Sequence, residues 1–206
     1  MSQQIVTFVT IFMSPKTKET IEKEAKKLFA LSGYEGFSMR VLSKQSGISM
    51  SSIYHFFSEK DSLLQSVFNK TNTGLGLKRA KLPKRKSATK MLEDRVIFQF
   101  ENIEDVVFVL KYYIHFRNNF KKIPTGFIPD KAYLHIEEVL RAGVKSGEFM
   151  LINSIEEDSK VVTHSINGFL LEYYPNTPKG SELKKLSRSI SEFILKSLTN
   201  KEVPMK

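Results

Sequence analysis

Apolar residues recur every three or four positions through most of the chain, which is the spacing of an amphipathic helix. A first helix is expected to begin at Ser14-Pro15 and to end at Gly33. Two short helices are expected next, over 38–45 and 49–56, because Ser38 and Ser49 are capping residues and a Ser-Gly turn lies between them. A fourth helix is expected to follow Ser58.

The second half of the chain also has helical spacing throughout. Residues 103–122 are apolar around most of a helix, which predicts a helix that is covered on several sides. Further helices are expected over 129–147, 154–174 and 181–198, the first closed by Gly147. Alternation typical of a strand is confined to residues 5–12, so the predicted fold class is all-α.

Composition excludes several classes of protein. The 206 residues include no cysteine, and the four histidines lack metal-ligand spacing, so no disulfide, metal or cofactor is expected. The apolar run 5–12 is too short to span a bilayer and lacks the features of a signal peptide. The expected location is the cytoplasm, with no membrane partner.

The formal net charge is +10, and most of the surplus lies in the first 95 residues. Residues 71–90 contain a dense basic run, two glycines and a proline, which predicts a linker or mobile loop. A basic surface of this kind attracts polyanions. Direct DNA contact by the loop and simple solvation both remain open for its basic side chains, which are Lys78, Arg79, Lys81, Lys84, Arg85 and Lys86.

Residues 47–57, Gly-Ile-Ser-Met-Ser-Ser-Ile-Tyr-His-Phe-Phe, place small hydroxyl side chains at one end of a short helix and large rings at the other. Two short helices joined by a glycine turn, with a third helix before them, form a helix-turn-helix. The second helix of that unit enters the major groove by its N-terminal end. Small side chains permit close approach, and hydroxyls can bond phosphates or base edges. The pattern therefore predicts double-stranded DNA as a partner.

Residues 17–70 also resemble the N-terminal DNA-binding domain of the TetR (tetracycline-repressor) family. The matching positions are Ala25, Phe29, Gly33-Tyr34, Phe37-Ser38, Gly47-Ile48-Ser49, Ile53-Tyr54-His55-Phe56-Phe57, Lys60 and Leu63-Leu64. The sequence departs from the family pattern at Val41, Ser43, Ser46 and Met50. The resemblance therefore implies the fold of this domain, but it does not imply which side chains contact the bases.

The resemblance implies four segments: an N-terminal extension (1–13), a helix-turn-helix domain (14–70), the basic linker or loop (71–90) and a helical regulatory and dimerisation domain (91–206). It further implies a homodimeric repressor without enzymatic activity. A small apolar or aromatic effector would release it from a palindromic or near-palindromic operator. Two alternatives remain open. One is a constitutive DNA-binding protein without an effector, and the other is a helical enzyme, for which no nucleophile–base or metal signature is present.

Three groups of candidate site residues follow. Those expected to contact DNA are Ser38, Arg40, Ser49, Met50, Ser51, Ser52, Tyr54, His55 and Lys60. Those expected to line an effector pocket are Phe98, Phe108, Tyr112, Phe116, Tyr133 and Phe169. Those expected at the dimer interface are Val162, Ile166, Phe169, Leu186, Ile190 and Phe193. Four carboxylates would suit a cationic ligand, although solvation is the commoner state of such groups: Glu101, Glu104, Asp105 and Glu172.

Overall fold

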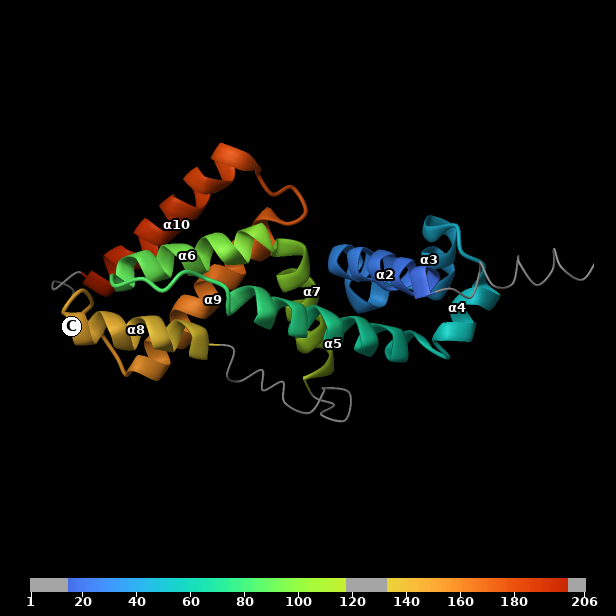
Figure 1. Ribbon diagram of the computed structural model, residues 1–206, viewed down its shortest axis with the longest axis horizontal. Coiled ribbons are helices and arrows are strands. Elements are labelled where there is room, and N and C mark those ends of the chain that lie inside the picture. The colour runs from blue at the N-terminus through green and yellow to red at the C-terminus, as the bar shows by residue number, and fades with distance from the viewer. Residues whose placement is uncertain (1–14, 118–132, 200–206) are drawn as a thin grey trace, which may run out of the picture. The chain divides into compact units, whose positions relative to one another are not determined.

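A computed structural model describes residues 15–117 and 133–199, and these residues form helices joined by loops and turns (Figure 1). Contacts divide the chain into two compact units. Unit 1 comprises residues 1–76 and 104–127, and unit 2 comprises residues 77–103 and 128–206. The predicted all-α class is confirmed. None of the described helices is long and apolar enough to cross a bilayer.

The helices of unit 1 are α2 (Pro15–Gly36), α3 (Met39–Ser46), α4 (Met50–Phe56), most of α5 (Lys60–Arg79) and α7 (Ile103–Phe116). Those of unit 2 are α6 (Ala88–Glu101), α8 (Leu134–Ser146), α9 (Ile155–Tyr173) and α10 (Gly180–Thr199). Within unit 2, α6 packs against both α8 and α10 (Figure 1). The expected helix start at Ser14, the N-terminal extension 1–13 and the end of the helix expected over 103–122 lie outside the described residues.

Aromatic rings hold α7 against the other helices of unit 1. Phe108 is fully buried and meets the ring of Phe29 edge-on at 5.2 Å between centroids. Tyr112, also fully buried, stacks on Phe68 of α5 at 4.3 Å. Because these rings belong to one core, residues 104–117 pack with the other helices of unit 1.

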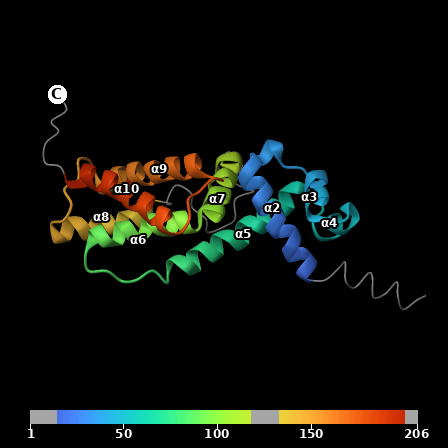
Figure 2. The same cartoon turned by 90° about the horizontal axis from the view of Figure 1, so that it is seen from above.

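Charged side chains link the same helices. Where α2 crosses α5 (Figure 2), Glu22 accepts hydrogen bonds from Ser66 Oγ and Lys70 Nζ, each at 3.0 Å. On α7, Asp105 and Glu104 both pair with Lys26 of α2. These two carboxylates are therefore engaged inside unit 1, which corrects the expectation that they suit a cationic ligand.

The stretch 71–90 is more helical than its composition predicts. Helix α5 continues through Gly74 and Gly76 to Arg79, and α6 begins at Ala88. Each interior glycine costs about 1 kcal/mol of helix stability relative to alanine. Burial of Thr71 and Leu75 in this stretch offsets that cost. Helix α6 itself was not predicted from the pattern.

The N-terminus of α6 is capped by a carboxylate that lies far away in sequence. Glu148 accepts backbone N–H bonds from Ala88 (2.9 Å) and Thr89 (3.0 Å), and it accepts a bond from Ser87 Oγ (2.8 Å). Bonds from the Thr89 and Ala88 amides lower the pKa of Glu148 to about 2. A negative charge here also interacts favourably with the positive end of the helix dipole.

We therefore expect Glu148→Gln to lower the free energy of unfolding by about 1–2 kcal/mol at pH 7, because the cap loses its charge. The folded pKa lies below the unfolded value of 4.5, so this stabilisation is present above pH 4.5 and is lost as pH falls toward 2. Urea unfolding of both proteins between pH 2 and 7 measures the difference. Glu101→Gln, which removes an exposed carboxylate from the same helix, should show no comparable pH-dependent loss.

Candidate nucleic-acid interface

Local capping fixes the two short helices α3 and α4. Ser38 Oγ accepts the Val41 amide at 3.1 Å, and Ser49 Oγ accepts the Ser52 amide at 3.2 Å, so both predicted N-caps are confirmed. Between them Gly47 takes the left-handed conformation (φ 68°, ψ 11°) that ends α3. Ser43 Oγ donates to the Ile48 carbonyl at 2.7 Å and holds the turn closed.

Helix α4 has one anchoring face and one exposed face. Ile53 is fully buried, and Phe57, just beyond the helix, is 5% exposed. At the other end, Ser49 Oγ lies 3.0 Å from Ser51 Oγ and 2.8 Å from Ser52 Oγ, which makes a cluster of hydroxyls at the helix N-terminus. This arrangement accounts for the small-to-large gradient along residues 47–57. Unpaired backbone N–H groups at a helix N-terminus also favour a phosphate.

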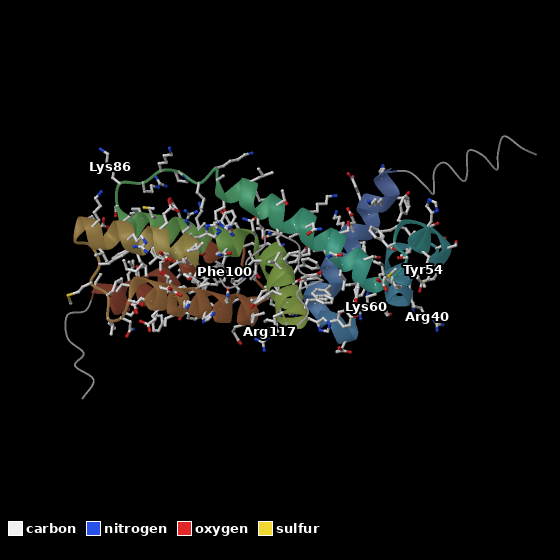
Figure 3. The ribbon with its side chains drawn as sticks, turned by 90° about the horizontal axis from the view of Figure 1, so that it is seen from below. Arg40, Tyr54, Lys60, Lys86, Phe100 and Arg117 are labelled. Atoms are coloured by element: carbon white, nitrogen blue, oxygen red, sulfur yellow. The ribbon has the colours of Figure 1, made fainter. Side chains whose placement is uncertain are left out.

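The other predicted DNA contacts of α3 and α4 differ in exposure. Arg40 and Tyr54 lie on the exposed surface of the two helices (Figure 3), and Tyr54 is 49% exposed. His55 is exposed as well, whereas Met50 is half-buried. The two helices thus carry an exposed guanidinium, an exposed phenol, an exposed imidazole and several hydroxyls. Their contact with DNA stays a prediction.

Lys60, the remaining predicted contact, is held by the end of α2. Its Nζ donates to the Tyr34 carbonyl at 2.5 Å and lies 3.6 Å from the centroid of the Tyr34 ring. Burial lowers the pKa of Lys60. The Tyr34 hydroxyl donates to Asp61 at 2.6 Å, and burial together with Asp61 raises its pKa to about 12. Lys60 is therefore a positioned cation with further N–H donors available.

Sequence patterns did not assign a role to Tyr34 or His115. The His115 ring of α7 stacks on Tyr34 at 3.7 Å with a 12° angle between planes. Two groups this close to one ring centroid occupy opposite faces, since they would overlap on the same face, so Tyr34 lies between His115 and Lys60. Lys111 of α7 also donates to the Ala30 carbonyl at 2.5 Å. Helix α7 thereby fixes the end of α2 that positions Lys60.

The basic run is only partly free to contact a polyanion. Arg79 lies at the end of α5, and Arg85 pairs with Asp94 at 2.7 Å. Lys78 donates to the Asn102 side chain at 2.8 Å. All six basic residues of the run are exposed except Arg79, which is half-buried, and Lys86 is labelled in Figure 3.

The six candidate pocket residues divide between the two units. Phe108, Tyr112 and Phe116 belong to the aromatic core of unit 1, where each is less than 5% exposed. The other three lie in unit 2: Phe98, Tyr133 and Phe169. Phe108 was expected to line an effector pocket. Its burial between Phe29 and Tyr112 assigns it to the core instead.

The six candidate residues of the dimer interface differ in exposure. Val162, Ile166 and Ile190 are at most 4% exposed within one protomer, so they pack inside unit 2 and cannot present a surface to a second chain. Phe193 is 62% exposed and meets Phe169 edge-on at 6.3 Å. Phe169 and Leu186 are half-buried. The surface available for a partner therefore centres on Phe193.

Among the described residues, no group of three or more His, Asp or Glu side chains is arranged to hold a metal ion.

Comparison with protein families matches both parts of the chain. Residues 21–67 match the model for bacterial regulatory proteins of the tetR family, and residues 127–200 match the model for the C-terminal region of QacR-like proteins. Among curated proteins, none matches the sequence.

Solved structures of regulators have the same fold. PfmR, a TetR-family transcriptional regulator from Thermus thermophilus, is 25% identical, with a TM-score of 0.63 over 87% of this chain and 99% of that one. The transcriptional regulator FadR from Bacillus subtilis, in complex with stearoyl-CoA, is 20% identical, with a TM-score of 0.63 over 87% and 98%. A regulatory protein of the tetR family from Rhodococcus is 16% identical, with a TM-score of 0.65 over 92% and 100%.

Proposed function

Because the chain belongs to the TetR family of non-enzymatic DNA-binding transcriptional regulators, we propose that it is a homodimeric repressor whose α4 enters the major groove of a palindromic operator. The observation that carries this proposal is the hydroxyl cluster at the N-terminus of α4, anchored from behind by Ile53 and Phe57. It would act in the cytoplasm, where bacterial DNA lies.

A small effector with an apolar or aromatic body would release the repressor. A relative of the same fold holds stearoyl-CoA, and another was solved in the context of control of antibiotic production by a bacterial hormone. An effector acts only if it binds one conformation more tightly than the other. The contacts of α7 with Ala30, Tyr34 and Lys26 give a physical route by which a shift of α7 would move the end of α2.

Selection of bound DNA from a random pool, followed by footprinting, tests the proposal. A palindromic consensus with two protected half-sites one helical turn apart would support it, because that spacing reflects a two-fold dimer. A footprint without symmetry, or no enrichment of any sequence, would contradict it. An effector screen by thermal shift and operator release then separates the repressor from a constitutive DNA-binding protein.

On this proposal, Lys60→Ala should weaken binding to all DNA sequences about equally, because an ammonium at the start of α5 meets phosphates and not bases. A dimer would lose two phosphate contacts, so the slope of log K against log salt should shrink by about 1.8. Fluorescence anisotropy at four salt concentrations measures the slope. Weakening confined to one operator position would show that Lys60 reads sequence.

Met50→Ala is the matched comparison. Met50 has neither charge nor hydrogen-bond donor, so it can contact thymine methyls but cannot form the bidentate guanine contact of arginine. Its loss should leave the salt slope unchanged and cost about 1 kcal/mol per half-site. On operators with uracil in place of thymine, Met50→Ala should not weaken binding, because the methyl group that Met50 contacts is absent. Equal losses of affinity on the thymine and uracil operators would show that Met50 does not contact the methyl group.

A further inference from the structure

Unit 2 holds a guanidinium that lacks a carboxylate partner among the described residues. Arg79, at the end of α5, lies with its guanidinium carbon 5.5 Å from the centroid of the Phe98 ring. Its Nη1 lies 2.6 Å from Nε2 of His135 on α8. A half-buried cation is ordinarily paired with an anion, and here the hydrogen-bond partner is an imidazole.

The state of that imidazole follows from the chemistry of arginine. A guanidinium only donates hydrogen bonds, so His135 Nε2 accepts and the ring is neutral. Desolvation by the neighbouring side chains, and after it the charges of Arg79 and Arg95, lower the pKa of His135 to about 4. His135 therefore orients Arg79 without neutralising it, and it leaves the other guanidinium N–H groups available.

A second guanidinium adds to this positive charge. Arg95 of α6 has a side chain only 15% exposed, and its Nη2 bonds to Glu138 at 3.1 Å. The Glu138 side chain is 65% exposed, so its charge is largely screened by water. Burial, and then the charge of Arg95, lower the pKa of Arg79 to about 10. Arg79 stays charged at neutral pH, and the charge of Arg95 is unfavourable for it.

We propose that Arg79, Arg95 and His135 form a binding site for an anionic group, a carboxylate or a phosphate, carried by the effector. An anion would compensate the repulsion between the guanidiniums and accept the N–H bonds that Arg79 leaves unused. Guanidinium groups bind carboxylate and phosphate in bidentate geometry. The link to an effector rests on the proposed function, whereas anion binding itself does not.

Small aromatic probes test the site on the full-length protein without DNA. Benzoate and phenyl phosphate supply the two kinds of anion, and benzyl alcohol is a neutral molecule of similar size. Isothermal titration should detect binding of at least one anion, with benzyl alcohol binding at least about tenfold more weakly, as expected for loss of a charge-assisted pair. The NMR signals of the His135 ring should shift on binding. Comparable binding of benzyl alcohol and the better-bound anion would overturn the proposal.

Arg79→Gln removes the charge while keeping an amide donor, and it should weaken anion binding by at least about tenfold. Arg85→Gln is the matched control, because Arg85 is a nearby arginine already paired with Asp94. It should leave anion binding unchanged. Arg79→Lys retains the charge but not the planar fork, and should bind with intermediate affinity if Arg79→Gln folds poorly. Unchanged anion affinity in both Arg79 variants would overturn the site.

Operator binding separates this site from the proposed function. Without a probe, Arg79→Gln should bind the operator as the unaltered protein does, with the same salt slope. A smaller slope would mean that Arg79 contacts DNA phosphates instead, and would overturn the effector site. Failure of the unaltered protein to bind any operator would contradict the proposed function alone, because anion binding is measured without DNA.

Discussion

Gly143→Ala is expected to lower the free energy of unfolding by about 3 kcal/mol, the upper end of the usual cost of overpacking. Gly143 lies in α8 under the ring of Phe149, and an added Cβ would lie 2.0 Å from Cδ2 of that ring. Phe149 is 5% exposed, and its amide donates to the Gly143 carbonyl at 3.1 Å. The ring can neither turn into solvent freely nor separate from the helix. Urea unfolding followed by circular dichroism measures the loss.

Two controls isolate the overlap. Gly76→Ala places the same methyl group at an exposed helical position with nothing within 4 Å, so it should stabilise α5 by about 0.5–1 kcal/mol. Phe149→Ala removes the ring, and in that background Gly143→Ala should no longer be destabilising. Additive losses in the double variant would show that contact with Phe149 is not the cause.

The helix-turn-helix could be predicted closely from the sequence because local chemistry specifies it. Ser38 and Ser49 cap their helices with their own side chains, and Gly47 supplies a left-handed residue that other residues rarely adopt. Neither feature depends on residues distant in sequence. Gly33, with φ 68° and ψ −169°, interrupts α2 at the residue where the first helix was expected to end, although α2 continues to Gly36.

Features that depend on distant contacts were predicted less well. Phe108 shares a helical face with polar residues, yet α2 covers it, and no local pattern shows which helix will pack there. Ser87 caps α6 locally through the Lys90 amide, but the shorter bonds to the Ala88 and Thr89 amides come from Glu148, about 60 positions away, so the local sequence carried only part of the signal for this helix. Periodicity also placed Ile190 on an apolar face without showing that its own protomer covers that face.

The anion site shows the same limit more clearly. Arg79 lay in a run of basic residues, where its expected alternatives were DNA contact or solvation. His135 had no neighbour at metal-ligand spacing and therefore no assigned role. Only the fold brings the two side chains within 2.6 Å of each other and places Arg95 near enough to influence both. Spacing along one helix cannot reveal a cluster whose members come from α5, α6 and α8.

Phe193→Asp is expected to convert the protein to monomers at micromolar concentration. We propose that α9 and α10 form the dimer interface, with Phe193 and the Phe169 ring beside it at the centre. An aspartate there would leave a charge without a partner in a buried interface, which is strongly unfavourable. Phe193 is 62% exposed in the protomer, so the fold of each chain should be retained. Light scattering distinguishes 23.7 kDa from twice that mass.

Operator affinity should decrease with the dimer, by about a hundredfold or more, since two linked half-site contacts become one. Val144→Asp is the control, because Val144 is a 43% exposed apolar residue on α8, outside the proposed interface. It should leave both the mass and the affinity unchanged. Ile190→Asp is not informative, because Ile190 is buried inside unit 2 and its replacement would disturb the fold. A Phe193→Asp protein that remains dimeric would show that another surface joins the two chains. A monomer that retained full operator affinity would show that dimerisation is not required for DNA binding.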